Sequence, residues 1–182
     1  MCAGLRKLFY CYTLTRVELM ATTRFFIVSC LILGLFACTP AKKKVSTASA
    51  PSMQLRLNIA NAAEDYLGTP YKYAGQKPST GFDCSGFTSY VLRQYKIALS
   101  PASAEQAKQG RPVPVERVQP ADLIFFSEGK SKVSHVALVV TRNKKGIVCI
   151  HSTTSRGVVM ENITTSKYWN PKILFARDVV SK

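Results

Sequence analysis

The chain has 182 residues, of which 47% are apolar, enough for one folded domain with a hydrophobic core and a leader. Its net charge is +15, and the part from residue 38 onward keeps +12, with 21 Lys/Arg against nine Asp/Glu. Simple solubility aside, such a surface favours a polyanionic partner: nucleic acid, anionic lipid or an acidic wall polymer. No basic run interleaved with aromatic residues and no helix-turn-helix pattern is present, so no nucleic-acid partner is expected.

The leader predicts export. Arg24 precedes 13 apolar or small residues at positions 25–37. This run is too short to span a bilayer, which takes about 20 residues, but it suits the core of a secretory signal. A start at Met20 would give that signal an ordinary length, so we expect Met20 to be the true start.

The end of the run, Leu35-Phe36-Ala37-Cys38, resembles a bacterial lipobox. It predicts that Cys38 becomes the lipidated first residue of the mature protein; the alternative is a plain signal peptide in which Cys38 is incidental. Thr39 stands where an aspartate would favour retention. By the same resemblance, we expect a lipid anchor in the outer membrane, on the periplasmic side, if the cell has two membranes.

Three segments follow from these signals: a signal peptide at 1–37, a lipidated flexible tether at 38–52, and a folded domain at 53–182. The tether is rich in Lys, Ala, Ser and Thr and has no apolar periodicity. Of six cysteines, three would leave with the signal and Cys38 would carry lipid. Cys84 and Cys149 then remain as free thiols, without a disulfide framework or a zinc-finger spacing.

Three helices are predicted in the first half of the domain. The first starts near Met53 and stops at Gly68, because apolar residues recur there at helical spacing, namely Leu55, Ile59, Ala62 and Tyr66. The second runs from Cys84 to about residue 96, with Phe87, Val91 and Tyr95 on its apolar face. The third is short, capped by Ser100 and ended by Gly110.

Strand patterns replace helical ones after residue 120. Five strands are predicted, at 122–126, 135–141, 147–152, 157–160 and 173–176, and 142–146 forms the hairpin loop between the second and third. Helices followed by a run of antiparallel strands indicate an α+β fold. We expect the N-terminal helices to pack on a central antiparallel sheet of about five strands.

Cys84 is the candidate nucleophile. Asp83 is a good N-cap, which puts Cys84 in the first turn, where the partial positive charge of the helix favours a thiolate. Gly81 and Gly86 allow backbone to approach closely on both sides. The alternative is an ordinary buried cysteine on an amphipathic helix.

The chain contains two histidines, and the predicted hairpin brings them together. His135 opens one strand and His151 closes the next, so both lie at the same end of an antiparallel pair. A turn centred on Asn143 or on Lys144 puts both side chains on one face of the sheet. A bulge at Gly146 would break this arrangement.

A cysteine at a helix start and two adjacent histidines are the components of nucleophilic catalysis. In this interpretation His135 takes the Cys84 proton, His151 orients the His135 ring, and the Cys84 backbone N–H stabilises the oxyanion. Ala137 and Val139 would form an apolar bed for the helix. Two alternatives are satisfied core histidines and a metal site formed with Cys84 and Asp83.

Five motifs in order resemble the NlpC-type family of bacterial cell-wall cysteine peptidases, over roughly residues 54–178. The motifs are Gly68-Thr69-Pro70-Tyr71-Lys72-Tyr73-Ala74-Gly75, Asp83-Cys84-Ser85-Gly86-Phe87, Asp122-Leu123-Ile124-Phe125-Phe126, Ser134-His135-Val136-Ala137-Leu138-Val139 and His151-Ser152. The resemblance implies a compact papain-like fold and a Cys84–His135–His151 triad. It also implies that Tyr71 leans over the nucleophile and that Asp83 and Ser85 line the substrate groove.

Three departures from the family pattern leave the triad untouched. Ala74 and Ala121 stand where the family usually has glycine, and Tyr73 stands where it often has tryptophan. They put the choice of substrate in doubt more than the activity.

The resemblance implies a murein endopeptidase that cuts stem peptides of peptidoglycan, at cross-links or between D-glutamate and the diamino acid. We expect a monomer tethered to the lipid bilayer, acting without a cofactor or a metal. One alternative is a non-catalytic wall-binding lipoprotein on the same fold. Another is an amidase or acyltransferase that uses the same three residues.

Overall fold

A computed structural model describes residues 50–129 and 131–181, which belong to a compact unit spanning Thr47–Lys182. The predicted signal peptide, Met20 and Cys38 lie outside the described residues. So does most of the predicted tether, although its last three residues belong to the first described helix, α2 (Ala50–Glu64). Among the described residues, no helix combines the length and apolar character needed to cross a bilayer.

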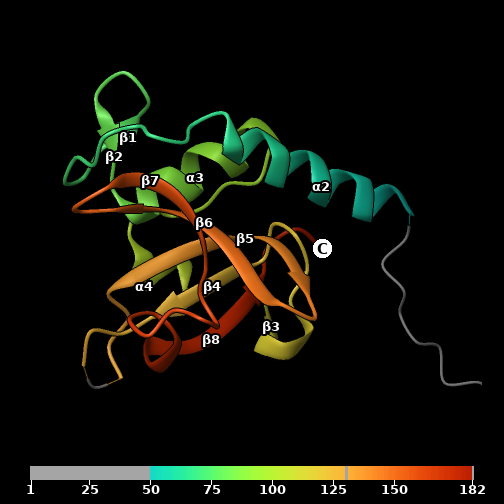
Figure 1. Ribbon diagram of the computed structural model, residues 1–182. Helices are drawn as coiled ribbons and strands as arrows, with labels where there is room; N and C mark the ends of the chain where they lie inside the picture. Colours follow the sequence, from blue (N-terminus) through green and yellow to red (C-terminus); the bar gives the residue numbers. More distant parts are fainter. Residues whose placement is uncertain (1–49, 130, 182) are drawn as a thin grey trace, which may run out of the picture. The chain divides into compact units, whose positions relative to one another are not determined.

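The helices lie together on one side of the sheet (Figure 1). Helix α2 gives way after Glu64 to a turn that reaches Gly68, whose φ of 81° suits glycine. Helix α3 (Cys84–Gln94) begins where the sequence predicts. The predicted third helix is wrong at both ends, because α4 covers only Ser103–Gln106. The Ser100 hydroxyl oxygen accepts from the Ala102 N–H before the helix begins.

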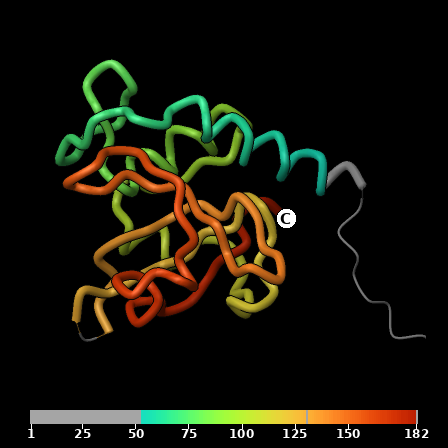
Figure 2. The backbone as a smooth tube through the Cα atoms, viewed as in Figure 1, coloured from blue at the N-terminus to red at the C-terminus, as the bar shows by residue number. Residues whose placement is uncertain are grey.

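The central sheet has six antiparallel strands in the order β3-β8-β4-β5-β6-β7. The five predicted strands are confirmed, and the set is β4 (Leu123–Phe126), β5 (His135–Asn143), β6 (Gly146–Thr153), β7 (Gly157–Asn162) and β8 (Ile173–Asp178). The edge strand β3 (Arg111–Val113) was missed, because three residues with a central proline give no strand pattern. Figure 2 shows the chain returning at its end, where β8 pairs with both β3 and β4.

Short elements complete the fold. Strands β1 (Gln76–Lys77) and β2 (Gly81–Phe82) form a small hairpin just before α3. Two 3₁₀ turns, Val115–Arg117 and Asn170–Lys172, lead into β4 and β8 respectively.

The two faces of the sheet carry separate cores. On the helix side, Val136 and Leu138 pack with Phe87 and its neighbours. On the other side, Ala137 and Val139 pack in a second cluster with Trp169. The prediction that Ala137 and Val139 pack under the cysteine helix is therefore wrong. Alternation along β5 turns Ala137 and Val139 away from α3, whereas Val136 and Leu138 face it.

A bulge in the β5–β6 hairpin keeps both histidine side chains on the same face of the sheet. The turn lies between Asn143 and Gly146, which pair directly, so it is centred neither on Asn143 nor on Lys144. That register alone would separate the two rings onto opposite faces. A register shift between Val139 and Thr141 adds one residue to β5 and restores the parity, so the rings meet after all.

Ala74 and Ala121 both adopt left-handed backbone, with φ of 54° and 68°. A side chain costs about 1–2 kcal/mol in that conformation, which glycine avoids. This is the physical reason for glycine at these positions in the family that the sequence resembles.

Candidate active site

The start of α3 holds Cys84 in place. The Asp83 carboxylate accepts the Gly86 N–H at 2.6 Å, as predicted for an N-cap. Gly86 is required by contact, because a Cβ there would come within 1.9 Å of the Gly75 carbonyl oxygen. Gly81, at a φ of 102°, is equally constrained, since a Cβ would meet the Pro70 carbonyl oxygen at 2.7 Å. The predicted close approach on both sides of Cys84 is thus confirmed.

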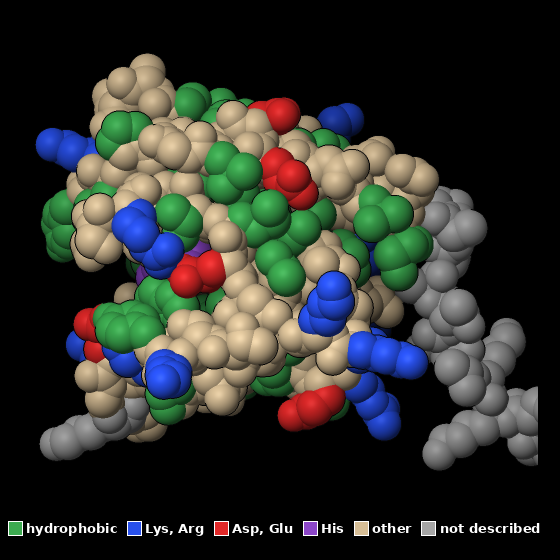
Figure 3. All heavy atoms as spheres, viewed as in Figure 1, with side chains coloured by type: hydrophobic (Ala, Val, Ile, Leu, Met, Phe, Trp, Pro, Cys, Tyr) green, Lys and Arg blue, Asp and Glu red, His purple; other side chains and the backbone are tan. Residues whose placement is uncertain are grey.

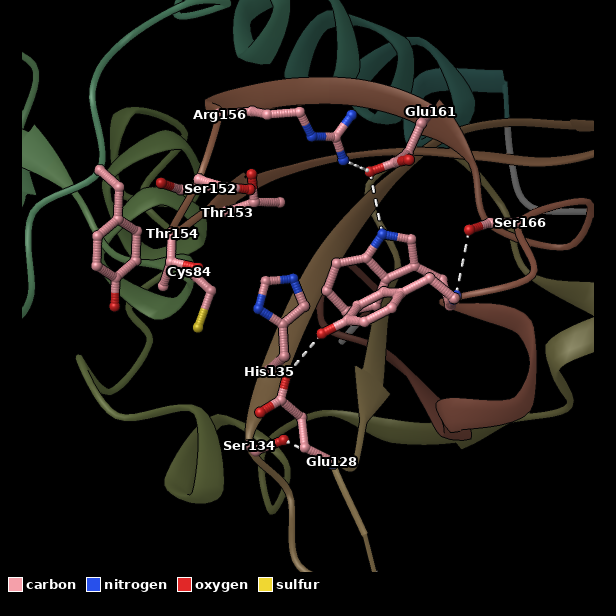
Figure 4. A pocket seen from close by; sticks show the side chains of 14 residues that line it. Cys84, Glu128, Ser134, His135, Ser152, Thr153, Thr154, Arg156, Glu161 and Ser166 are labelled. Carbon is pink, nitrogen blue, oxygen red and sulfur yellow. Dashed lines mark hydrogen bonds and ion pairs between the residues drawn. The ribbon is translucent and has the colours of Figure 1, made fainter.

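The two histidines are hydrogen-bonded to each other. His135 Nε2 and His151 Nδ1 lie 2.7 Å apart, with the His151 side chain fully buried. This bond leaves Nδ1 as the free nitrogen of His135. In Figure 4 that nitrogen points toward the sulfur of Cys84. The half-buried thiol of Cys84 is therefore followed in space by the imidazole of His135 and then by that of His151.

A carboxylate continues this line beyond His151. His151 Nε2 lies 2.9 Å from Glu161 Oε1, and the Trp169 indole N–H donates to the same oxygen at 3.0 Å. Arg156 forms an ion pair with it through Nη2 at 2.5 Å. A carboxylate only accepts, so His151 donates from Nε2 and accepts at Nδ1 from His135 Nε2–H. His135 then keeps an unprotonated Nδ1 facing the thiol.

Trp169 forms the apolar wall behind both imidazoles. Its ring stacks on His135 at 4.6 Å between centroids and 23° between planes, and it meets His151 edge-on at 4.9 Å. Phe126 adds a further ring contact to His135. This enclosure fixes both rings and excludes water from the bond between them.

The electrostatics keep the cysteine and histidine neutral at rest. Burial, reinforced by the Asp83 carboxylate, raises the pKa of Cys84 to about 11. Burial also lowers the pKa of His135 to about 3, and the neighbouring His151 and Lys172 act in the same direction. The expected thiolate at the helix start is therefore wrong: desolvation and Asp83 outweigh the helix N-terminus and the backbone N–H groups of Val136, Ser85 and Cys84.

This neutral pair predicts how Cys84 reacts with iodoacetamide. Because the thiolate is the reactive form and its pKa is raised, alkylation at Cys84 should rise about tenfold per pH unit from neutral pH toward pH 11. Peptide-resolved mass spectrometry measures the rate at this one residue. A rate that is already maximal at pH 6 would instead indicate a thiolate–imidazolium pair.

Cys84 and His135 open onto a cavity of about 360 Å³, whereas His151 lies fully buried behind His135. Cys84, His135, Tyr71, Arg156, Glu161 and Trp169 contribute to its lining, together with the hydroxyl-rich segment 152–155. Figure 3 shows the hollow at the left of the molecule, with histidine atoms visible at its back, and Figure 4 shows the side chains from close by.

The further predicted site residues divide into two groups. Tyr71 reaches the cavity, next to Cys84. Asp83 and Ser85 lie beside it and engage each other, since the Ser85 hydroxyl donates to the Asp83 carboxylate at 3.2 Å. Their part in binding a substrate stays a prediction.

The metal alternative finds no support in the side chains. Within residues 50–129 and 131–181, no three His, Cys, Asp or Glu side chains converge as a metal site needs. The facing ring nitrogens of the histidines are engaged with each other. Cys149 is fully buried in the apolar cluster on the sheet face turned away from α3.

Sequence reasoning missed Glu161, Arg156 and Trp169. Glu161 pairs with Cys149 across β6–β7, and Cys149 shares the strand face of His151, so alternation would have indicated Glu161. That inference needs the register of β7, which a turn of three residues sets. Trp169 reaches the site from an irregular segment, where periodicity carries no signal.

Comparisons with known proteins point to one family. The sequence profile of the NlpC/P60 family matches residues 68–178. Gamma-DL-glutamyl hydrolase of Bacillus subtilis is 35% identical over 126 residues, 68% of this chain and 30% of that protein. A probable endopeptidase of Haemophilus influenzae is 29% identical over 159 residues, 83% of this chain and 94% of that protein.

A solved structure shares the fold as well. An NlpC/P60 family protein from Bacillus cereus superposes with a TM-score of 0.63 at 31% identity, over 69% of this chain and 40% of that chain. The chain thus spans less than half the length of the Bacillus proteins it matches. With more than half of its residues matched by the family profile and an α+β fold of the same kind, the chain belongs to the NlpC/P60 family.

Proposed function

We propose that this protein is a cysteine peptidase that hydrolyses the stem peptides of peptidoglycan. The observation that carries the proposal is the line from Cys84 through His135 to His151, which opens onto a cavity of about 360 Å³. Family membership supports it, as do the names of the two relatives, a gamma-DL-glutamyl hydrolase and a probable endopeptidase.

The reaction begins from a neutral thiol and a neutral imidazole. As Cys84 Sγ attacks the peptide carbonyl carbon, its proton passes to His135 Nδ1, and the carbonyl becomes an oxyanion. The Cys84 backbone N–H and the Tyr71 hydroxyl are the candidate donors to that oxygen. The imidazolium then gives its proton to the leaving amine, and a thioester remains on Cys84.

Water completes the cycle. His135 accepts a proton from the water that attacks the thioester, and the acid product leaves with Cys84 as a thiol again. His151 keeps the His135 ring in the tautomer with a free Nδ1 through both halves. The buried setting makes proton transfer concerted with bond formation, because separated charges are costly there.

The bond is proposed to be the one between D-glutamate and the diamino acid, or a cross-link between stem peptides. The name of the Bacillus subtilis relative supports a γ-glutamyl bond. The net charge of +12 from residue 38 onward suits an anionic wall polymer. A lipid anchor at Cys38, on the periplasmic side of an outer membrane, would hold the enzyme against that polymer.

Defined muropeptides test the proposal. The protein is incubated with a cross-linked dimer and with a linear stem peptide, and the products are identified by mass spectrometry. Cleavage within the stem, with a new amine and a new carboxylate, supports a peptidase. Hydrolysis of the amide between the glycan lactyl group and the stem peptide, which frees the intact stem peptide, identifies an amidase. Transfer of the acyl group to an added amine identifies an acyltransferase. Binding to sacculi without any product identifies the wall-binding alternative.

A further inference from the structure

We propose that Glu161 is a positioning residue of this site: its carboxylate fixes the tautomer of His151 and, through it, the free nitrogen of His135. The inference rests on the proposed function only for its kinetic readout. Its structural basis is the geometry of one oxygen, Glu161 Oε1, on which three donors converge.

Without a further partner, either imidazole can be the donor in the hydrogen bond between them. In the productive direction His135 donates from Nε2, and its Nδ1 is free to take the Cys84 proton. In the reverse direction His151 donates from Nδ1, His135 accepts at Nε2, and its Nδ1 carries a proton toward the thiol. The reversed pair has no base, although the distance of 2.7 Å would be the same.

Glu161 removes this ambiguity. As an ionised carboxylate it can only accept, so it requires the proton of His151 to sit on Nε2. Among the described residues, Glu161 is the one acceptor at that nitrogen. Outer partners of this kind generally fix the ring orientation and tautomer of a functional histidine.

Glu161 is itself fixed by the residues around it. The Trp169 indole N–H and the Arg156 guanidinium both donate to Oε1. Hydrogen bonds from Arg156, His151 and Trp169 outweigh the partial burial of the carboxyl and keep its pKa below its usual range. Glu161 therefore stays ionised at neutral pH.

The charge of Glu161 acts on the transition state as well. Burial lowers the pKa of His151, whereas Glu161 acts to raise it and Arg156 opposes Glu161. The other titratable groups facing the pair are Cys84 and Lys172. Positive charge that develops on the imidazoles during attack is thus partly balanced by the carboxylate.

The test uses two variants that separate the acceptor from the charge. Glu161→Gln keeps an oxygen at the position of Oε1 and loses the charge, whereas Glu161→Ala loses both. The chain has two histidines, so ¹⁵N-histidine NMR reports both tautomers without ambiguity. Glu128→Gln is the matched control, because Glu128 lines the same cavity without contacting either ring.

The unsubstituted protein is expected to show both histidines protonated at Nε2 near neutral pH. Glu161→Gln should keep that pattern, and Glu161→Ala should give a mixture with Nδ1–H forms. The kcat should fall about 10- to 100-fold in Glu161→Ala, with KM changed much less. In Glu161→Gln the acid limb of kcat/KM should move to lower pH, since loss of the carboxylate lowers the pKa of the pair.

The NMR result decides the inference even if no stem peptide is cleaved. An unchanged tautomer pattern in Glu161→Ala, or the same mixture in Glu128→Gln, overturns it. So does a kcat in Glu161→Ala within twofold of the unsubstituted enzyme when that enzyme is active.

Discussion

Replacing Cys84 by alanine is expected to lower the rate of stem-peptide cleavage by at least about 10⁴-fold, which abolishes the digestion of sacculi. The variant removes the sulfur that attacks and leaves the cavity, the histidines and the cap of α3 in place. Binding should therefore survive, and the loss should appear in kcat. Soluble fragments released from purified sacculi measure the digestion, and defined muropeptides give the rate.

The matched control is Cys149→Ala. It removes the same atom from the other described cysteine, which is fully buried on the sheet face turned away from α3 and does not line the cavity. Its activity should stay close to that of the unsubstituted protein. Full digestion by Cys84→Ala, or an equal loss in both variants, contradicts the proposed hydrolase.

Local sequence signals were sufficient to place Cys84 at the start of α3. Asp83 as N-cap and the glycines around Cys84 follow from turn chemistry and from close backbone approach, and the structure confirms both. The five longer strands follow from apolar alternation. The sequence also predicts that His135 and His151 meet, because opposite ends of consecutive antiparallel strands are neighbours.

The features that the sequence could not predict depend on strand register and on burial from solvent. The bulge near Val140 has no local marker, yet without it the histidines would face opposite sides. The thiol pKa depends on how deeply Cys84 is enclosed, which is a property of the whole fold. Burial also explains why the sequence does not reveal the role of Arg56. A charged residue on a helix is typical of the protein surface, but Arg56 is 1% exposed.

Arg56 joins three distant segments through a buried network. From α2 it forms ion pairs with Asp122 at 2.6 Å and with Asp178 at 2.5 Å, and it donates to the Pro120 carbonyl and the Ser181 hydroxyl. Asp122 immediately precedes β4, and Asp178 ends β8. The network therefore anchors the helix layer to the start of one central strand and the end of another.

Replacing Arg56 by alanine is expected to lower the free energy of unfolding by about 3–5 kcal/mol, because it leaves two buried carboxylates without their shared partner. Arg111→Ala is the matched control: Arg111 also pairs with Asp178, at 2.7 Å, but its side chain is 64% exposed. Solvent screens that pair, so its loss should cost about 0–1 kcal/mol. Urea unfolding monitored by circular dichroism measures both variants.

The pH dependence distinguishes a lost ion pair from lost packing. Burial acts to raise the pKa of Asp178, but the Ser181 N–H, Arg111 and Arg56 together lower it to about 2. A carboxyl with a depressed pKa stabilises the fold above its unfolded pKa of about 3.8, and this stabilisation is lost as the pH falls toward 2. The part of the difference between Arg56→Ala and the unsubstituted protein that comes from Asp178 should therefore narrow between about pH 4 and pH 2. The part that comes from Asp122, whose pKa burial raises to about 6, should already be lost as the pH falls through 6. A deficit that stays constant over this range would mean that Arg56 stabilises the fold through its aliphatic contacts instead of its charge. A deficit equal to that of Arg111→Ala would mean that the buried ion pairs of Arg56 contribute no more than an exposed one.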